Sequence, residues 1–206
     1  MEISKTDWGL LENCSQNRET RANLSVMLDV TPNYVSKELS KLSKLELIEE
    51  VGPAENSGMY VTTSKGDYTL EKQDKYEKQH SELFGELINS SVEIAEQLTE
   101  ESEEKAVKTE DIIITSVDAY DQLHRVRDIG KFDLQSAKEA SKYDNIYAVY
   151  GVLYELRFHD LLARPSGEDE YRITELGNTL IEKPTPATVT VENLNRVWNG
   201  IPYKRE

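Results

Sequence analysis

Apolar residues recur at helical spacing soon after the first thirty residues of the chain. At steps of four, three and three they are Val35, Leu39, Leu42 and Leu45. This spacing puts them on one stripe of an α-helix. Thr31 is a strong N-cap residue, and Pro32 suits the first helical position because its missing N–H needs no partner there. The pattern therefore predicts a helix from Pro32 to about Leu45.

Two further helices are predicted before this one. The first runs over residues 6–16, with Thr6 as its N-cap candidate and Cys14 on its apolar side. The second runs from Thr20 to about Asp29, so only a short turn separates it from the helix that begins at Pro32. Two helices joined by such a short turn are typical of a helix-turn-helix.

A β-hairpin is predicted after the third helix. Two short β-type runs, 47–51 and 59–62, flank the segment 53–58, which is rich in Pro, Asn, Ser and Gly. This combination is typical of two antiparallel strands joined by a turn. Three helices and a hairpin together predict a winged helix for residues 1–70.

The chain also contains an internal repeat. The pattern Tyr-x-x-Thr-x-x-Gly occurs at 60–66 and again at 171–177, an offset of 111. Apolar positions match at the same offset without a gap back to residue 33; Leu42, for example, meets Leu153. A repeated supersecondary unit is the simplest explanation.

The predicted fold class is therefore mainly α with small β-hairpin wings: two winged helix-turn-helix units joined by a long helix. Residues 1–70 form the first unit and 111–183 the second. Between them, 71–110 predicts an acidic helical stalk, since it lacks proline and carries twelve acids against five bases. Residues 184–206 form a tail, for which a short helix near 191–198 is expected.

Charge changes the picture at one place. The chain has 39 acidic and 24 basic residues, a net charge of −15, and such a surface normally repels nucleic acid. The helix from Pro32 is the exception, because three lysines and several small polar residues lie opposite its apolar stripe. Cations hold phosphates, and short hydrogen-bonding groups reach base edges. The predicted DNA-binding residues are Arg21, Thr31, Asn33, Tyr34, Ser36, Lys37, Ser40, Lys41 and Lys44.

Residues 31–42, Thr-Pro-Asn-Tyr-Val-Ser-Lys-Glu-Leu-Ser-Lys-Leu, followed by Leu-Ile-Glu-Glu-Val-Gly at 47–52 and Tyr60…Gly66, resemble the winged helix-turn-helix of archaeal transcriptional regulators. The segment is most similar to the phage-repressor-like group of haloarchaea, and the likeness covers about 6–70. The resemblance implies sequence-specific binding of double-stranded DNA, usually as a dimer. It also implies an archaeal or archaeal-virus source, and the acidic composition is typical of a halophilic host.

The second copy is predicted to have lost this DNA face. At the offset of 111, Ala148, Val152 and Glu155 take the positions of the three lysines. An apolar face on a surface module suggests a partner surface, and self-association is the first interpretation. A small-ligand pocket and burial within its own domain stay open as alternatives.

The stalk supplies a second candidate surface for a homodimer. Its apolar residues, beginning at Tyr76, step by seven, four, seven and four, which is compatible with a coiled-coil seam. The alternative is that the helix packs on the winged helices of its own chain. The predicted dimerisation residues are Leu83, Leu87, Ile94, Leu98, Tyr147, Tyr150, Tyr154 and Trp198.

Other classes of protein are disfavoured. No apolar run reaches about 18 residues and no basic leader precedes one, so neither a membrane span nor a signal peptide is expected. His80, His124 and His159 stand at no metal-ligand spacing, and Cys14 is the only cysteine. We expect no metal, no cofactor and no enzymatic activity. The prediction is a cytoplasmic repressor acting as a homodimer on double-stranded DNA; the alternative is a protein-interaction module without DNA binding.

Overall fold

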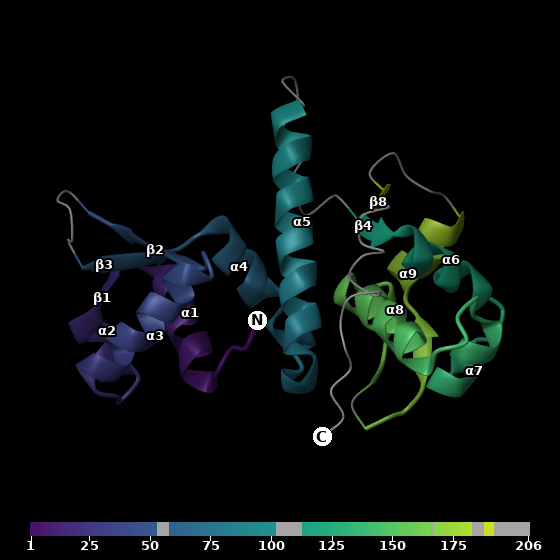
Figure 1. Cartoon of the computed structure of the whole chain (residues 1–206), viewed down its shortest axis with the longest axis horizontal. Helices are drawn as coiled ribbons and strands as arrows, with labels where there is room; N and C mark the ends of the chain where they lie inside the picture. Colours follow the sequence, from purple (N-terminus) through teal and green to yellow (C-terminus); the bar gives the residue numbers. More distant parts are fainter. Residues whose placement is uncertain (53–57, 102–112, 166, 183–187, 192–206) are drawn as a thin grey trace. The chain divides into compact units, whose positions relative to one another are not determined.

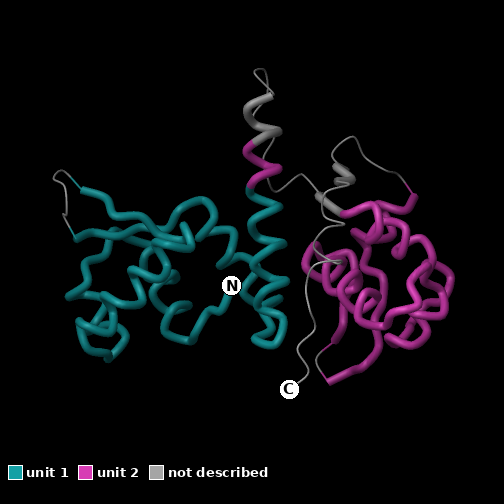
Figure 2. The backbone as a smooth tube through the Cα atoms, in the orientation of Figure 1, with its two compact units in different colours: residues 1–92 teal, residues 93–206 magenta. Residues whose placement is uncertain are grey.

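The computed structural model is mainly helical, with small sheets of two and three strands. It describes residues 1–52, 58–101, 113–165, 167–182 and 188–191, and only the backbone of 97–101, 113–115 and 188–191. The chain divides into two compact units, which Figure 2 distinguishes by colour: unit 1 is residues 1–92 and unit 2 is residues 93–206.

Unit 1 begins with three helices that lie against an antiparallel sheet of strand order β1-β3-β2 (Figure 1). Its elements in chain order are α1 (Lys5–Gln16), β1 (Glu19–Thr20), α2 (Arg21–Met27), α3 (Pro32–Lys44), β2 (Ile48–Val51), β3 (Met59–Thr62), α4 (Ser64–Glu71), the 3-10 turns η1 (Gln73–Lys75) and η2 (Lys78–His80), and the first half of α5 (Ser81–Glu101). The helix expected from Pro32 and the hairpin after it are both confirmed.

The start of α1 differs from the expectation. Ser4, not Thr6, is the N-cap: its hydroxyl accepts from the Asp7 N–H at 3.2 Å, and the Asp7 carboxylate accepts from the Ser4 N–H at 2.7 Å. This reciprocal capping box satisfies two backbone donors at once, which a single threonine cap would not do. The cap expected at Thr31 is confirmed, since its hydroxyl accepts from the Tyr34 N–H. Thr20, expected as the first residue of the second helix, is its N-cap and accepts from the Asn23 N–H.

The predicted stalk is only partly a single helix. Residues 71–80 hold the end of α4 and two 3-10 turns, and α5 begins at Ser81. The Phe84 ring on α5 meets Trp8 and Tyr76 edge to face, with centroids 6.5 and 5.2 Å apart. The first half of α5 therefore packs on α1, as the alternative interpretation of the stalk expected.

From α6 to α9, unit 2 repeats the order of elements that unit 1 shows from α1 to α4. Its elements are β4 (Ile113–Ser116), α6 (Val117–Arg125), β5 (Lys131–Phe132), α7 (Leu134–Ala140), α8 (Ile146–Phe158), β6 (Leu162–Ala163), β7 (Tyr171–Ile173), α9 (Glu175–Glu182) and β8 (Thr188–Val191). The order β5-β7-β6 of its antiparallel sheet matches β1-β3-β2. β4 and β8 pair in parallel, so residues 188–191 of the predicted tail form a strand. The helix expected near 191–198 lies almost wholly outside the described residues.

The repeated Thr and Gly join the helix after the hairpin to the preceding turn. The Thr63 hydroxyl caps α4 by accepting from the Gly66 N–H and donates to the Glu46 carbonyl oxygen. Thr174 makes the same bonds to Gly177 and to the Asp160 carbonyl oxygen. A Cβ on Gly66 would lie 2.0 Å from the Leu47 carbonyl oxygen, and one on Gly177 would lie 2.4 Å from that of Leu161. Neither position therefore has room for a side chain, and glycine is required at both.

The residue pairing between the two copies needs a correction. The Thr and Gly positions keep the offset of 111, but α3 and α8 both have 13 residues and begin at 32 and 146, an offset of 114. The hairpins explain the difference of three. Ile48 pairs with Thr62, 14 residues on, whereas Leu162 pairs with Ile173, 11 residues on. The second hairpin is three residues shorter, so one ungapped offset cannot hold along the whole repeat.

Candidate nucleic-acid interface

One face of α3 is polar, cationic and exposed. Its exposed residues at steps of four, three and four are Asn33, Lys37, Ser40 and Lys44. They lie opposite the buried stripe of Val35, Leu39 and Leu42, which anchors the helix in unit 1. Because the helix is fixed from behind, these four side chains form a preorganised stripe, called here the α3 stripe.

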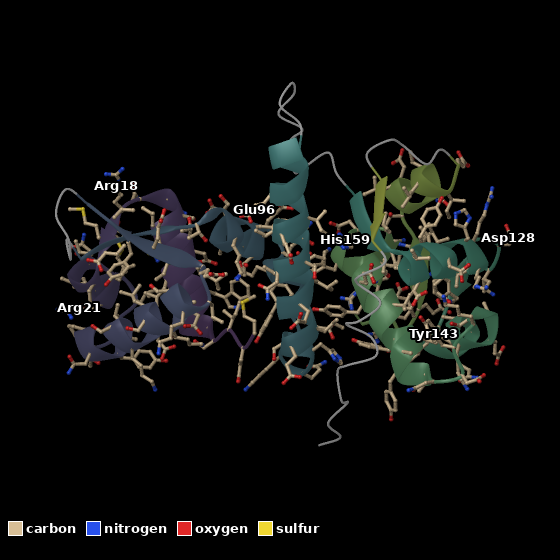
Figure 3. The ribbon with its side chains drawn as sticks, turned by 45° about the horizontal axis from the view of Figure 1, so that its top comes forward. Arg18, Arg21, Glu96, Asp128, Tyr143 and His159 are labelled. Carbon is tan, nitrogen blue, oxygen red and sulfur yellow. The ribbon has the colours of Figure 1, made fainter. Side chains whose placement is uncertain are left out.

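Residues beside the α3 stripe connect it to α2. The Arg21 guanidinium, at the first position of α2, donates from Nη1 to the Ser36 hydroxyl at 3.0 Å. Figure 3 shows Arg21 on the outside of the ribbon of unit 1. Tyr34 is 39% exposed and Thr31 caps the helix, so the expected flanking residues lie on the surface around its N-terminal end.

The lysines of α3 fall into two kinds. The ammonium groups of Lys37 and Lys44 lie within 4.0 Å of no carboxylate in the described part of the chain, and both side chains are exposed. Lys41 instead turns toward α1. Its Nζ lies 2.5 Å from Oδ2 of the fully buried Asp7 and 3.7 Å from Oε2 of Glu38. This geometry does not favour the predicted contact of Lys41 with phosphate, because its charge already faces buried acid.

Sequence reasoning missed Asp7. Burial alone would raise the pKa of its carboxyl group, but the hydrogen bonds from Lys41 and Ser4 outweigh burial and lower that pKa. Burial alone would lower the pKa of Lys41, but its hydrogen bond to Asp7 raises that pKa. The Ser4-x-x-Asp7 capping box was a local signal for Asp7, whereas nothing local indicates its partner on α3.

A matched pair of lysine substitutions separates the two kinds. We expect Lys41→Met to lower the free energy of unfolding by about 2 kcal/mol, because it leaves buried acids without their cation; the partial exposure of Lys41 reduces the usual penalty for a broken buried pair. Lys37→Met should change it by less than about 0.5 kcal/mol. Denaturant unfolding measures both, and equal effects would contradict the structural role of Lys41.

The corresponding face of α8 is aromatic. At the offset of 114, Asn33, Ser36 and Ser40 are replaced by tyrosines, and Lys37 and Lys44 by glycine and phenylalanine. The α8 residues at these five positions are Tyr147, Tyr150, Tyr154, Gly151 and Phe158. The positions that correspond to the α3 stripe therefore still lack lysines in α8, although the residue pairs differ from those at the offset of 111. Tyr154 and Phe158 are buried, whereas Tyr147 is 40% exposed.

Glu155 takes the position of Lys41. It is fully buried, and its two carboxylate oxygens accept from the Ser116 N–H at 2.5 Å and the Ser116 hydroxyl at 2.7 Å. Ser116 is the N-cap of α6, so Glu155 satisfies donors at a helix start where a negative charge is favourable. Glu155 therefore caps α6 from inside unit 2. The offset of 111 had instead paired it with Lys44, on an exposed face.

The expected dimerisation residues are not all accessible. Leu83, Leu87 and Tyr154 are buried in the chain, so they do not form the exposed seam or surface that was expected. Ile94 and Tyr150 are half-buried, and Tyr147 remains exposed. The side chain of Leu98 and all of Trp198 lie outside the described residues.

Comparison of the chain with protein-family models, with curated proteins and with solved structures found no match. Among the described residues, no helix is both long enough and apolar enough to cross a membrane. The same residues contain no group of three His, Cys, Asp or Glu side chains arranged to hold a metal ion. Burial raises the pKa of Cys14 to about 12, which keeps this thiol protonated and unreactive.

Proposed function

We propose that the protein is a sequence-specific regulator of transcription that binds double-stranded DNA, and that it acts as a repressor. In this proposal unit 1 is a winged helix-turn-helix and α3 is its recognition helix. The observation that carries the proposal is the α3 stripe: two unpaired lysines and two short polar side chains on one exposed helix face, in a chain of charge −15. The resemblance of residues 31–52 to archaeal regulators supports the same function.

Each residue around the stripe has a distinct role in this proposal. Lys37 and Lys44 hold phosphates, because neither ammonium group has an ion pair in the part of unit 1 that the structure describes. Asn33 and Ser40 approach base edges, and the amide of Asn33 suits adenine. Arg21 donates to Ser36 and also contacts a phosphate, while Tyr34 contacts the DNA backbone.

The acidic remainder of the chain limits how much affinity comes from charge. Lys37, Lys44 and Arg21 supply about three phosphate contacts per chain, and each contact contributes about −0.9 to the slope of log K against log salt. We therefore expect a shallow slope of about −3 per chain, well below that of strongly basic regulators. Specificity would then rest on base contacts and on the fit of the helix in the groove.

A homodimer is part of the proposal. Two recognition helices placed about 34 Å apart would meet successive major grooves on one side of the duplex. Support comes from the resemblance to a group that usually binds as dimers. Ile94, Tyr147 and Tyr150 are the expected contact residues that stay at least partly accessible. Sedimentation with and without DNA measures the stoichiometry.

Selection of bound sequences from a pool of random duplexes, repeated at several salt concentrations, tests the proposed function. We expect one enriched motif with two half-sites about one helical turn apart. The shallow salt slope is measured on the winning duplex. If no motif is enriched at any salt concentration, the DNA-binding proposal is wrong.

The second candidate function is a protein-interaction module that binds no DNA. The aromatic face of α8 and the net charge of −15 favour it. The charges of Lys37 and Lys44 disfavour it, since neither lysine has an ion pair among the described residues of unit 1. A defined protein partner that binds the full chain, together with a failed duplex selection, would establish this second function.

A further inference from the structure

The contact between α1 and α3 holds more acid than base. Asp7 is fully buried and Glu38 is 7% exposed, and Lys41 is the cation within 4.0 Å of both carboxylates. If both acids were ionised, this acid–lysine contact would carry a net charge of −1 away from water. An uncompensated buried charge is costly, and the usual response is that the group binds a proton.

One oxygen atom marks where that proton belongs. Oδ2 of Asp7 accepts from the Ser4 N–H and from Lys41, but Oδ1 is buried and has no hydrogen-bond partner. A buried acceptor without a donor costs about 1–3 kcal/mol. The Glu38 carboxyl group shares the Lys41 ammonium group with Asp7, at 3.7 and 2.5 Å, and a carboxyl group can donate a hydrogen bond only in its protonated form.

We propose that Asp7 and Glu38 share one proton, which Glu38 donates to Asp7, and that this proton fastens α1 to α3. Lys41 neutralises the carboxylate that stays ionised. The acid–lysine contact is then electrically balanced: one negative charge, one positive charge and one neutral acid. The proposal does not rest on DNA binding, because it concerns how unit 1 holds its own helices together.

The directions of the pKa shifts agree with a shared proton. Burial, together with the neighbouring Asp7, raises the pKa of Glu38 above its ordinary value. The pKa of Asp7 shifts the other way, since its hydrogen bonds from Lys41 and Ser4 outweigh burial. Two adjacent carboxyl groups whose pKa values move apart behave as a pair that holds one proton.

Other charged groups nearby do not supply the missing donor. Lys37 acts on Glu38 only through its charge, which lowers the pKa of Glu38. Glu2 likewise acts on Lys41 only through its charge. The other charged side chains on the neighbouring elements are exposed or bonded to other groups. They are Lys5 and Glu12 on α1, Arg21 on α2, Glu49 and Glu50 on β2, Lys65, Asp67 and Glu71 on α4, and Glu82 and Glu86 on the part of α5 that packs on α1.

The sign of the pH dependence follows from these shifts. Glu38, with a raised pKa in the folded chain, contributes stability at low pH that is lost as the pH rises through that pKa. Asp7, with a lowered pKa, contributes stability that is lost as the pH falls through its own. The contribution of this pair of acids to the stability of unit 1 is therefore largest between the two pKa values and falls as the pH rises through that of Glu38.

Glu38→Gln in the full chain tests the proposal, because a glutamine amide donates to Asp7 at every pH. We expect its unfolding midpoint to lie about 4 °C above that of the unchanged chain at about pH 8, and the difference to shrink as the pH falls through the raised pKa of Glu38. Glu49→Gln removes the same charge from an exposed site on β2 and should leave the pH dependence unchanged.

Carboxyl ¹³C NMR of the unchanged full chain tests the pair directly, without any variant or DNA. We expect the Glu38 signal to titrate above its ordinary range and the Asp7 signal below its own. A Glu38 signal that titrates at its ordinary pKa would overturn the proposal. So would a Glu38→Gln variant that keeps the original pH dependence or melts lower at every pH.

Discussion

The double variant Lys37→Glu, Lys44→Glu is expected to bind the selected duplex at least about 100-fold more weakly, a loss of about 2.7 kcal/mol. Two attractive contacts with phosphates become repulsive ones, and the repulsion adds to the field of an already acidic chain. Neither lysine has an ion pair in the described part of unit 1, so its fold should be unaffected. Fluorescence anisotropy measures the affinity.

The matched control changes net charge equally at a different place. Lys5→Glu with Lys78→Glu adds the same negative charge through two exposed lysines that are not on α3. We expect this control to lose less than about fivefold at moderate salt, since exposed charges that do not contact the duplex are largely screened by salt. Equal losses in both double variants would mean that affinity follows total charge, and the α3 stripe would be rejected as the DNA-binding face.

Gly66→Ala is expected to destabilise unit 1 by about 3 kcal/mol or more. The new Cβ would lie 2.0 Å from the Leu47 carbonyl oxygen, which itself accepts the Thr63 N–H at 3.1 Å. Making room for the methyl group therefore pulls apart the hydrogen bond that joins α4 to the turn after α3. Denaturant unfolding measures the loss, and Gly177→Ala should cause a similar one in unit 2, where the contact is 2.4 Å.

Gly130→Ala separates crowding from backbone strain. Gly130 has a φ of +79°, and a Cβ there would meet nothing within 4 Å. Its substitution should cost about 1 kcal/mol, the ordinary penalty for a left-handed backbone. If Gly66→Ala cost no more than Gly130→Ala, the repeated glycine would not be required by close packing.

The sequence pattern located α3, its cap and the hairpin correctly because those features are local. The residue pairing between the copies was not recoverable from the same pattern. A shift of three residues rotates a helix by about 300°, which is close to a full turn, so an apolar stripe shifted by three residues still nearly matches the original stripe. Leu42 therefore met an apolar partner at either offset, Leu153 at 111 or Leu156 at 114, and apolar matches alone could not reveal the shorter second hairpin.

The two kinds of lysine could not be separated from sequence either. Lys37, Lys41 and Lys44 all lie on the polar side of the predicted helix, and spacing gives no reason to treat them differently. The distinction comes from Asp7, 34 residues earlier and on another helix. Likewise the aromatic residues of α5 and α1 meet only through the tertiary fold, so a seam drawn from helical spacing alone put buried leucines on the outside.

The buried carboxylate beside the first helix of each unit comes from opposite partners: Asp7 belongs to α1, whereas Glu155 belongs to α8. Copying the whole of α3 into α8 would place an ammonium group where Ser116 now donates two hydrogen bonds. Both Ser116 donors would then lose their acceptor, and the incoming lysine would have no counterpart of Asp7 as its carboxylate partner. The two helices, equal in length and at the same step of the element order, are thus not interchangeable, and a chimera should keep Glu155.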